Sequence, residues 1–160
     1  MSLEKNIIDL ARRAKQASRE VALLPTSVKN DALKRMAKAL LSEADFLKKE
    51  NDKDLIVAEK ANYAKALVDR LRLSDKTIKG MADCLLDTAK LKDPVGEILA
   101  TYKRPNGLVI KKVRVPIGVV GIIYESRPNV TSDCIGLTLK SGNAVILKGG
   151  KEAVHSNQAI

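Results

Sequence analysis

Two short polar segments each follow a run of apolar residues, and they carry the residue types that could do chemistry. The first, residues 125–129, reads Glu-Ser-Arg-Pro-Asn and follows the apolar run 119–123. An amide or hydroxyl here could donate a hydrogen bond to a developing oxyanion, and a guanidinium could hold a carboxylate or phosphate through two bonds. Asn129 and Ser126 are the candidates for the first role, and Arg127 is the candidate for the second. The alternative is helix capping by Asn129 or Thr131, with Arg127 on the surface.

The second polar segment, residues 148–151, reads Lys-Gly-Gly-Lys and follows the apolar run 144–147. Two glycines let a backbone approach a bulky group closely, and the N-terminus of a following helix offers free N–H groups to an anion. Lys148 and Lys151 add two positive charges, which would suit a phosphate on a nucleotide ribose. The spacing matches neither the P-loop nor the GxGxxG motif. A tight turn with solvated lysines is therefore the alternative.

The cysteines and the single histidine are favoured as structural residues. Cys84 and Cys134 stand far apart and form no CxxC pair, whereas a structural zinc site needs about four clustered ligands. Cys134 falls early in a predicted helix, where a thiol pKa can be lowered, but its neighbours are apolar and no base is close in the sequence. His155 stands alone in a polar stretch, which favours a helix surface. We expect no metal site, no disulfide and core positions for both thiols.

The elements around the two polar segments follow the order strand, helix, strand, helix. Residues 119–123 and 144–147 are continuous apolar runs, which are typical of strands covered on both faces. A helix is predicted between them at about 130–140, and Gly142 is expected to close it in a left-handed conformation. A crossover helix between two buried strands implies parallel pairing, with ligands bound at the carboxyl ends of the strands. A last helix is predicted to begin near Glu152.

Upstream, residues up to about 93 are predicted to be amphipathic helices. Apolar residues recur at helical spacing over 3–21, and Pro25 ends that helix. Residues 42–45 resemble a capping box, which predicts that a helix restarts there. Ser74 is expected to cap another helix. These helices are expected to pack on the rest of a larger protein, because two parallel strands do not make a stable sheet by themselves.

Composition narrows the class of protein. The chain has 160 residues, 45% of them hydrophobic, which suits one globular domain. It contains no run of about 18 apolar residues and no basic-then-apolar leader, so we expect no membrane partner and a cytoplasmic location. The net charge is +10, but the basic residues are dispersed and only three Tyr and one Phe are present. Nucleic acid is therefore not the expected partner, although a basic binding module is the alternative.

Long motifs around both polar segments resemble one enzyme family. Residues 113–131 read VRVPIGVVGIIYESRPNVT and residues 140–153 read KSGNAVILKGGKEA. Both closely resemble the gamma-glutamyl phosphate reductases, also called glutamate-5-semialdehyde dehydrogenases, of the aldehyde dehydrogenase superfamily. Residues 93–96 and 104–108 fit the same family. The resemblance covers the whole chain, weakly in the helices and strongly from about residue 93.

The resemblance implies an α/β fold of the aldehyde dehydrogenase type, of which this chain would be only the N-terminal part. Residues 1–104 would be the N-terminal helical part of the nucleotide-binding domain. Residues 105–116 would form a strand of an oligomerising extension, and residues 117–160 would begin the Rossmann-like β-α-β nucleotide-binding unit. A homo-oligomer is therefore expected.

The resemblance also implies the reaction of an oxidoreductase. NADPH would reduce L-glutamyl 5-phosphate to L-glutamate 5-semialdehyde with release of phosphate, a step of proline biosynthesis. A cysteine thiolate would first displace phosphate to give a thioester. In this family that cysteine lies downstream of residue 160, so neither cysteine of this chain matches it. The chain alone is expected to be inactive.

Site residues follow from the same resemblance. Lys148 matches the lysine that contacts the adenosine ribose in aldehyde dehydrogenases. NAD-preferring relatives place a glutamate three residues later, where this sequence has Lys151, and a lysine would attract a 2′-phosphate. Ser126 and Arg127 are assigned to the substrate, and the superfamily's oxyanion-donating asparagine corresponds either to Asn129 or, because the spacing differs, to Ser126. The implied cofactor-binding residues are Ile123, Lys148, Gly149, Gly150 and Lys151.

Overall fold

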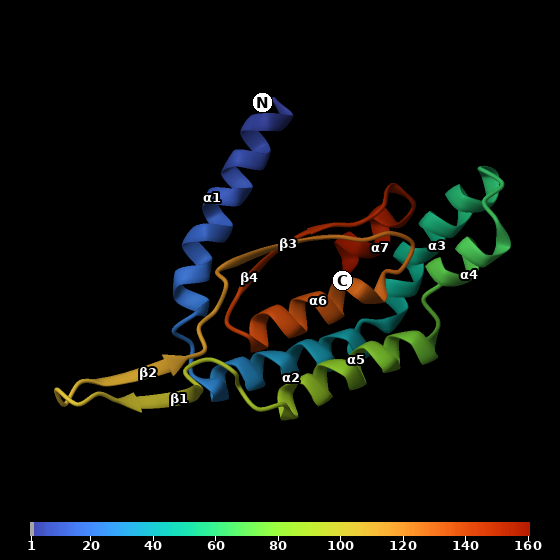
Figure 1. Ribbon diagram of the computed structural model, residues 1–160. Helices are drawn as coiled ribbons and strands as arrows, with labels where there is room; N and C mark the ends of the chain where they lie inside the picture. The colour runs from blue at the N-terminus through green and yellow to red at the C-terminus, as the bar shows by residue number, and fades with distance from the viewer. Residues whose placement is uncertain (1) are drawn as a thin grey trace.

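The computed structural model describes residues 2–160, which form a helical body, a projecting hairpin and a small parallel sheet (Figure 1). Figure 1 shows α2, α5 and α6 running side by side, with β3 and β4 over α6. α1 contacts β4 and β3 while its N-terminal end projects outward, and the β1–β2 hairpin extends away from this body. The elements, in chain order, are α1 (Leu3–Val21), α2 (Thr26–Ser42), α3 (Ala44–Lys60), α4 (Lys65–Leu71), α5 (Asp75–Lys90), β1 (Ile98–Lys103), β2 (Val109–Val113), β3 (Val119–Ile123), α6 (Asn129–Lys140), β4 (Ala144–Lys148), the 3₁₀ helix η1 (Lys151–Ala153) and α7 (Val154–Ala159).

The apolar core lies where α2, α3, α5 and α6 meet. Gly136 on α6 faces α5 so closely that a Cβ atom there would lie 2.7 Å from Cδ2 of Leu85. The missing side chain therefore permits the close contact of these two helices. Burial of each large apolar side chain contributes about 1.5–3 kcal/mol, so this cluster provides the main attraction between the helices. Its buried members are Leu33, Ala37, Leu40, Leu47, Leu73, Ile78, Met81, Ala82, Leu85 and Ala89.

Buried lysines join the helices at the other end of the body. Lys29 is 1% exposed and pairs with Asp93, which also accepts from the Thr26 hydroxyl at 2.8 Å. Lys140 is 3% exposed, and its Nζ donates to Asn30 Oδ1 at 2.6 Å and to the Ala89 carbonyl at 2.9 Å. Burial lowers the pKa of Lys140; the Asp93 carboxylate opposes this shift and the charge of Lys29 reinforces it. Sequence analysis did not anticipate this cluster.

β3 and β4 pair in parallel, as predicted, with Val119 opposite Ala144 and Ile123 opposite Lys148. The connection through α6 is also as predicted, and Gly142 closes α6 with a φ of +75°. The expectation that both strands are covered on both faces is wrong for the described residues. Ile123, the last residue of β3 in this two-stranded sheet, is 81% exposed, although α1 and α6 both contact β4.

Residues 98–103 form a strand that the sequence analysis did not predict. They form β1, which pairs antiparallel with β2, with Tyr102 opposite Ile110. The predicted strand region 105–116 therefore contains only the second strand of a hairpin, together with its turn. The turn signal at 105–107 marks the middle of this hairpin rather than its start: Gly107 has a φ of +86° and its N–H donates to the Arg104 carbonyl at 2.9 Å.

The helical region follows the predicted order with two differences. Ser74 caps α5 as expected, since its Oγ accepts from the Thr77 N–H at 3.1 Å. The capping box predicted at 42–45 is absent, because α3 begins without a side-chain cap. The short helix α4 was not predicted; it follows a turn in which Asn62 has a φ of +53°. Among the described residues, no helix is long and apolar enough to cross a membrane.

Candidate functional site

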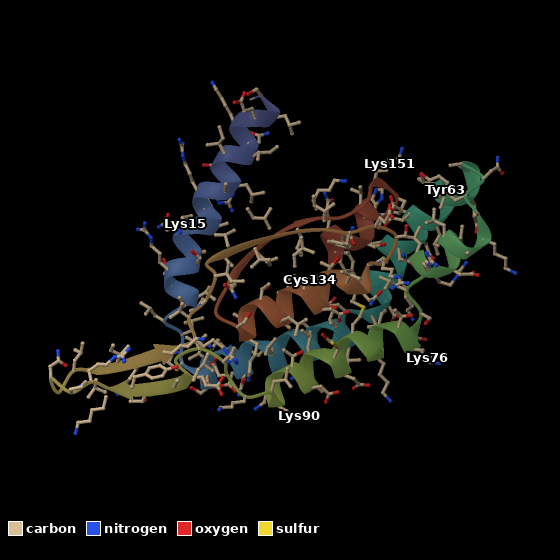
Figure 2. The ribbon with its side chains drawn as sticks, viewed as in Figure 1. Lys15, Tyr63, Lys76, Lys90, Cys134 and Lys151 are labelled. Carbon is tan, nitrogen blue, oxygen red and sulfur yellow. The ribbon has the colours of Figure 1, made fainter. Side chains whose placement is uncertain are left out.

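The two polar segments meet at one edge of the molecule. Because β3 and β4 are parallel and in register, the residues that follow them leave the sheet on the same side. The Tyr124 N–H donates to the Lys148 carbonyl at 3.1 Å, which extends the strand pairing by one step. Figure 2 shows Lys151 at the outer edge of the molecule, where η1 begins after β4. The structure thus brings together the two segments that the sequence separates.

A hollow of about 580 Å³ lies between the two strand ends. Four of the five residues assigned to the cofactor from sequence line it, and Gly149 is the exception. Both lysines are exposed, so two positive charges face solvent at its rim. Its lining residues are Ile123, Tyr124, Glu125, Lys148, Gly150, Lys151 and Glu152.

The two glycines of this loop make room for side chains of the chain itself. A Cβ atom at Gly149 would collide with the side-chain amide of Asn157, and one at Gly150 would collide with the carboxylate of Glu152. The sequence-based expectation was that the glycines let a bulky ligand approach the backbone. In the structure, two polar side chains occupy that space instead.

Several backbone amides at the start of the helix that follows the loop are hydrogen-bonded within the chain. The N–H groups of His155 and Ser156 donate to the buried carboxylate of Asp54, at 3.1 and 2.8 Å. Within η1, the Ala153 N–H donates to the Gly150 carbonyl at 3.3 Å. Three of the N–H groups near this helix N-terminus are therefore already hydrogen-bonded within the chain.

Ser126 faces the second loop rather than open solvent. It is 5% exposed, and its φ of +53° is left-handed. Its N–H donates to Glu152 Oε1 at 2.6 Å, and its Oγ donates to the same oxygen at 3.2 Å. Burial would raise the pKa of Glu152, but hydrogen bonds from its own N–H and from Ser126, together with the charge of Lys148, lower it. The carboxylate is therefore ionised at neutral pH.

A second polar connection crosses the same site. Tyr124 Oη lies 2.6 Å from Thr131 Oγ1, and the Thr131 hydroxyl donates to Asn157 Oδ1 at 3.1 Å. Since Thr131 donates onward, Tyr124 is the donor in the first bond. This chain of bonds links the segment that follows β3 to α6 and α7. Sequence analysis missed Tyr124, Thr131, Glu152 and Asn157 as site residues; the excess of polar side chains next to both strand ends was the available signal.

Asn129 and Arg127 occupy different environments. Arg127 is exposed. Asn129 is the first residue of α6 and is half-buried, and its Nδ2 donates to Asp133 Oδ2 at 3.3 Å. It lines a separate hollow with Cys84 and Asp133, not the hollow that Lys148 and Lys151 line. The alternative of capping by Asn129 or Thr131 is also not found, because Pro128 occupies the N-cap position and α6 has no side-chain cap.

The cysteines and His155 show structural environments. Cys84 and Cys134 are both free and half-buried, rather than in the core as expected. Burial raises the pKa of both thiols, and the charge of Asp133 adds to each shift, so neither favours a thiolate. His155 lies at the surface as expected, with its ring 45% exposed, but its Nδ1 is 2.7 Å from Asp54 Oδ1.

Comparison with known proteins identifies relatives of one kind. No family model matches the chain. A gamma-glutamyl phosphate reductase from Caldanaerobacter subterraneus is 59% identical over 150 residues, which cover 94% of this chain and 36% of the relative. The crystal structure of a gamma-glutamyl phosphate reductase from Thermotoga maritima matches with a TM-score of 0.93 and 41% identity, over 95% of this chain and 37% of that one. The chain thus spans a little more than a third of the length of these relatives.

A more distant likeness concerns the fold alone. A structure from Bacillus subtilis, assigned to the aldehyde dehydrogenases, matches with a TM-score of 0.72 and 17% identity, over 97% of this chain and 32% of that one. The predicted fold class, α/β of the aldehyde dehydrogenase type, is therefore confirmed. The reductases match nearly the whole chain at high identity, and the motifs at both strand ends fall within that match, so the chain is similar to the gamma-glutamyl phosphate reductases over a little more than a third of their length.

Proposed function

We propose that this chain is part of an oxidoreductase that reduces L-glutamyl 5-phosphate to L-glutamate 5-semialdehyde with NADPH and releases phosphate, in proline biosynthesis. The observation that carries the proposal is the 59% identity to a curated reductase over 94% of the chain. The meeting of the two polar segments at the carboxyl ends of parallel strands supports it, because α/β sheets bind ligands there.

The residues at the hollow fit a nicotinamide cofactor that carries an extra phosphate. Lys148 and Lys151 are exposed at the rim, where they can approach an anion without further desolvation. Glu152, which also lines the hollow, has its carboxylate engaged by Ser126, and this reduces its repulsion of a phosphate. Ile123 offers an exposed apolar surface beside the lysines. When bound, NADPH supplies the hydride for the reduction.

The substrate roles belong to the loop that follows β3. We assign Arg127 to a phosphate or carboxylate of the substrate, since its guanidinium is exposed and can make two parallel hydrogen bonds. Asn129 is assigned to the oxyanion in preference to Ser126, because the Ser126 hydroxyl and N–H are both engaged by Glu152. The thiol environments of Cys84 and Cys134 support a nucleophile that lies outside this sequence.

Assembly and location are part of the same proposal. The β1–β2 hairpin extends from the body and exposes apolar side chains, including Tyr102 and Val109, which are each about half exposed. Such a surface suits pairing with a second copy of the chain. We propose a homo-oligomer in the cytoplasm, with glutamyl phosphate as the small-molecule partner and neither nucleic acid nor membrane.

The test uses the natural full chain that contains this sequence. Purified enzyme is supplied with glutamate 5-semialdehyde, phosphate and NADP⁺, and formation of NADPH is followed, because the acyl phosphate is unstable and the reaction is reversible. We expect phosphate-dependent turnover with NADP⁺. Turnover that proceeds equally well without phosphate would point to an ordinary aldehyde dehydrogenase and would contradict the proposal.

A further inference from the structure

Glu152 and Ser126 join the loops that follow β3 and β4. Two hydrogen bonds run from Ser126 to one carboxylate oxygen, at 2.6 Å from the N–H and at 3.2 Å from the hydroxyl. Ser126 has a left-handed backbone, which costs free energy for a residue with a side chain. The strong N–H bond to a carboxylate offsets that cost. The turn at Ser126 therefore depends on an acceptor supplied by the other loop.

The absence of a side chain at Gly150 leaves room for the Glu152 carboxylate. The φ of −67° and ψ of 155° at Gly150 suit any residue, so its backbone does not require glycine. What requires glycine is space, since a Cβ atom at this position would collide with both carboxylate oxygens of Glu152. Gly150 and Glu152 thus act together, and an alanine at position 150 would push the carboxylate away from Ser126 without changing any charge.

We propose that Glu152 is a positioning residue, whose carboxylate holds residues 124–128 in the turn that sets the placement of Arg127 and Asn129 toward the substrate. This inference rests on the proposed function for the roles of Arg127 and Asn129. Glu152 itself contacts no reacting atom. It acts through the turn at Ser126, and the charge of Lys148 nearby helps to keep it ionised.

The first measurement is hydrogen–deuterium exchange over residues 124–128 in the full chain. Glu152→Ala and Gly150→Ala should each speed exchange of the Ser126 amide at least tenfold, because its acceptor is removed or displaced. Glu152→Gln should restore most of the protection, since its side-chain oxygen can still accept. Matched controls are Gly121→Ala, where an added Cβ meets nothing within 4 Å, and Glu59→Gln, an exposed carboxylate on α3.

The second measurement is steady-state kinetics of the same variants. Glu152→Ala and Gly150→Ala should each lower kcat/KM for glutamyl phosphate at least tenfold. The double variant should be no worse than either single variant, because both remove the same contact. Glu152→Gln should recover activity, which a loss through altered charge at the cofactor hollow would not allow.

The two measurements separate the possible failures. An inactive wild-type full chain would contradict the proposed function, while exchange at Ser126 still decides whether Glu152 holds the turn. Unchanged exchange, or kinetics of Glu152→Ala within twofold of wild type, would overturn the inference. If circular dichroism shows that Glu152→Ala does not fold, Glu152→Gln and Ser126→Ala are compared instead. Equal losses of kcat/KM in these two variants that add up in the double variant would show that the two residues act independently. That result would overturn the inference.

Discussion

Lys151 tests the cofactor assignment at the scale of a single residue. Lys151→Glu should weaken use of NADPH far more than use of NADH, because a negative charge would replace a positive one beside the proposed 2′-phosphate site. A loss of about 1 kcal/mol for each of the two effects shifts the NADPH/NADH preference about thirtyfold. The measurement is kcat/KM for both cofactors at fixed ionic strength, with Lys76→Glu on α5 as the control. Equal losses for the two cofactors would show that Lys151 does not contact the phosphate.

A substitution at Cys134, also at the scale of a single residue, tests whether this thiol is the catalytic nucleophile. In the full enzyme, Cys134→Ala should leave kcat near that of wild type, because burial raises the pKa of this thiol and Asp133 raises it further. A loss above about a thousandfold, which corresponds to some 4 kcal/mol of barrier, in a folded variant would place the nucleophile here after all.

At the scale of elements, Gly136 controls how closely α5 and α6 pack. Gly136→Ala should destabilise the protein by about 1–3 kcal/mol, since the new methyl group meets the buried Leu85 side chain, which has little room to move. Gly80→Ala is the matched control, because an added Cβ there meets nothing within 4 Å. It should instead stabilise α5 by roughly 0.5–1 kcal/mol. Urea denaturation measures both, and equal effects would contradict this account of the packing.

Asp93 couples α2 to the loop after α5, and its titration makes stability depend on pH. Burial would raise the pKa of Asp93, but hydrogen bonds from Lys29, Val95 and Thr26 and the charge of Lys29 lower it. A carboxyl whose folded pKa lies below its unfolded value, near 3.9, stabilises the fold above that pH. The contribution is lost as pH falls through the folded pKa. Acidification below about pH 4 should lower the free energy of unfolding more in wild type than in Asp93→Asn; parallel pH profiles would contradict this.

At the scale of the whole molecule, residues 1–160 contain the proposed cofactor and substrate loops without a suitable nucleophile. The isolated segment should therefore show no NADPH-dependent turnover of glutamyl phosphate, whereas the full chain should be active. The assay is NADPH oxidation at matched protein concentration, with circular dichroism to establish folding of the isolated segment. Turnover by the segment would show that Cys84 or Cys134 performs the thiol chemistry.

Local patterns in the sequence determined the secondary structure and the topology around the site. Continuous apolar runs predicted β3 and β4, the crossover length predicted their parallel pairing, and the cap residues Ser74 and Gly142 were placed correctly. These features depend on neighbouring residues, whose spacing is read directly along the chain. The resemblance of the two strand-end motifs also named the family.

Only the tertiary structure decided which polar groups meet. Three sets of hydrogen bonds join residues that are far apart in the sequence: those from Ser126 to Glu152, those from the α7 amides to Asp54, and those of the buried Lys140 side chain. A serine, carboxylate or lysine is equally compatible with a solvated surface, so its type and position do not indicate its partner. The partner is chosen when packing removes these groups from water, because a buried polar group must then find a hydrogen bond within the fold.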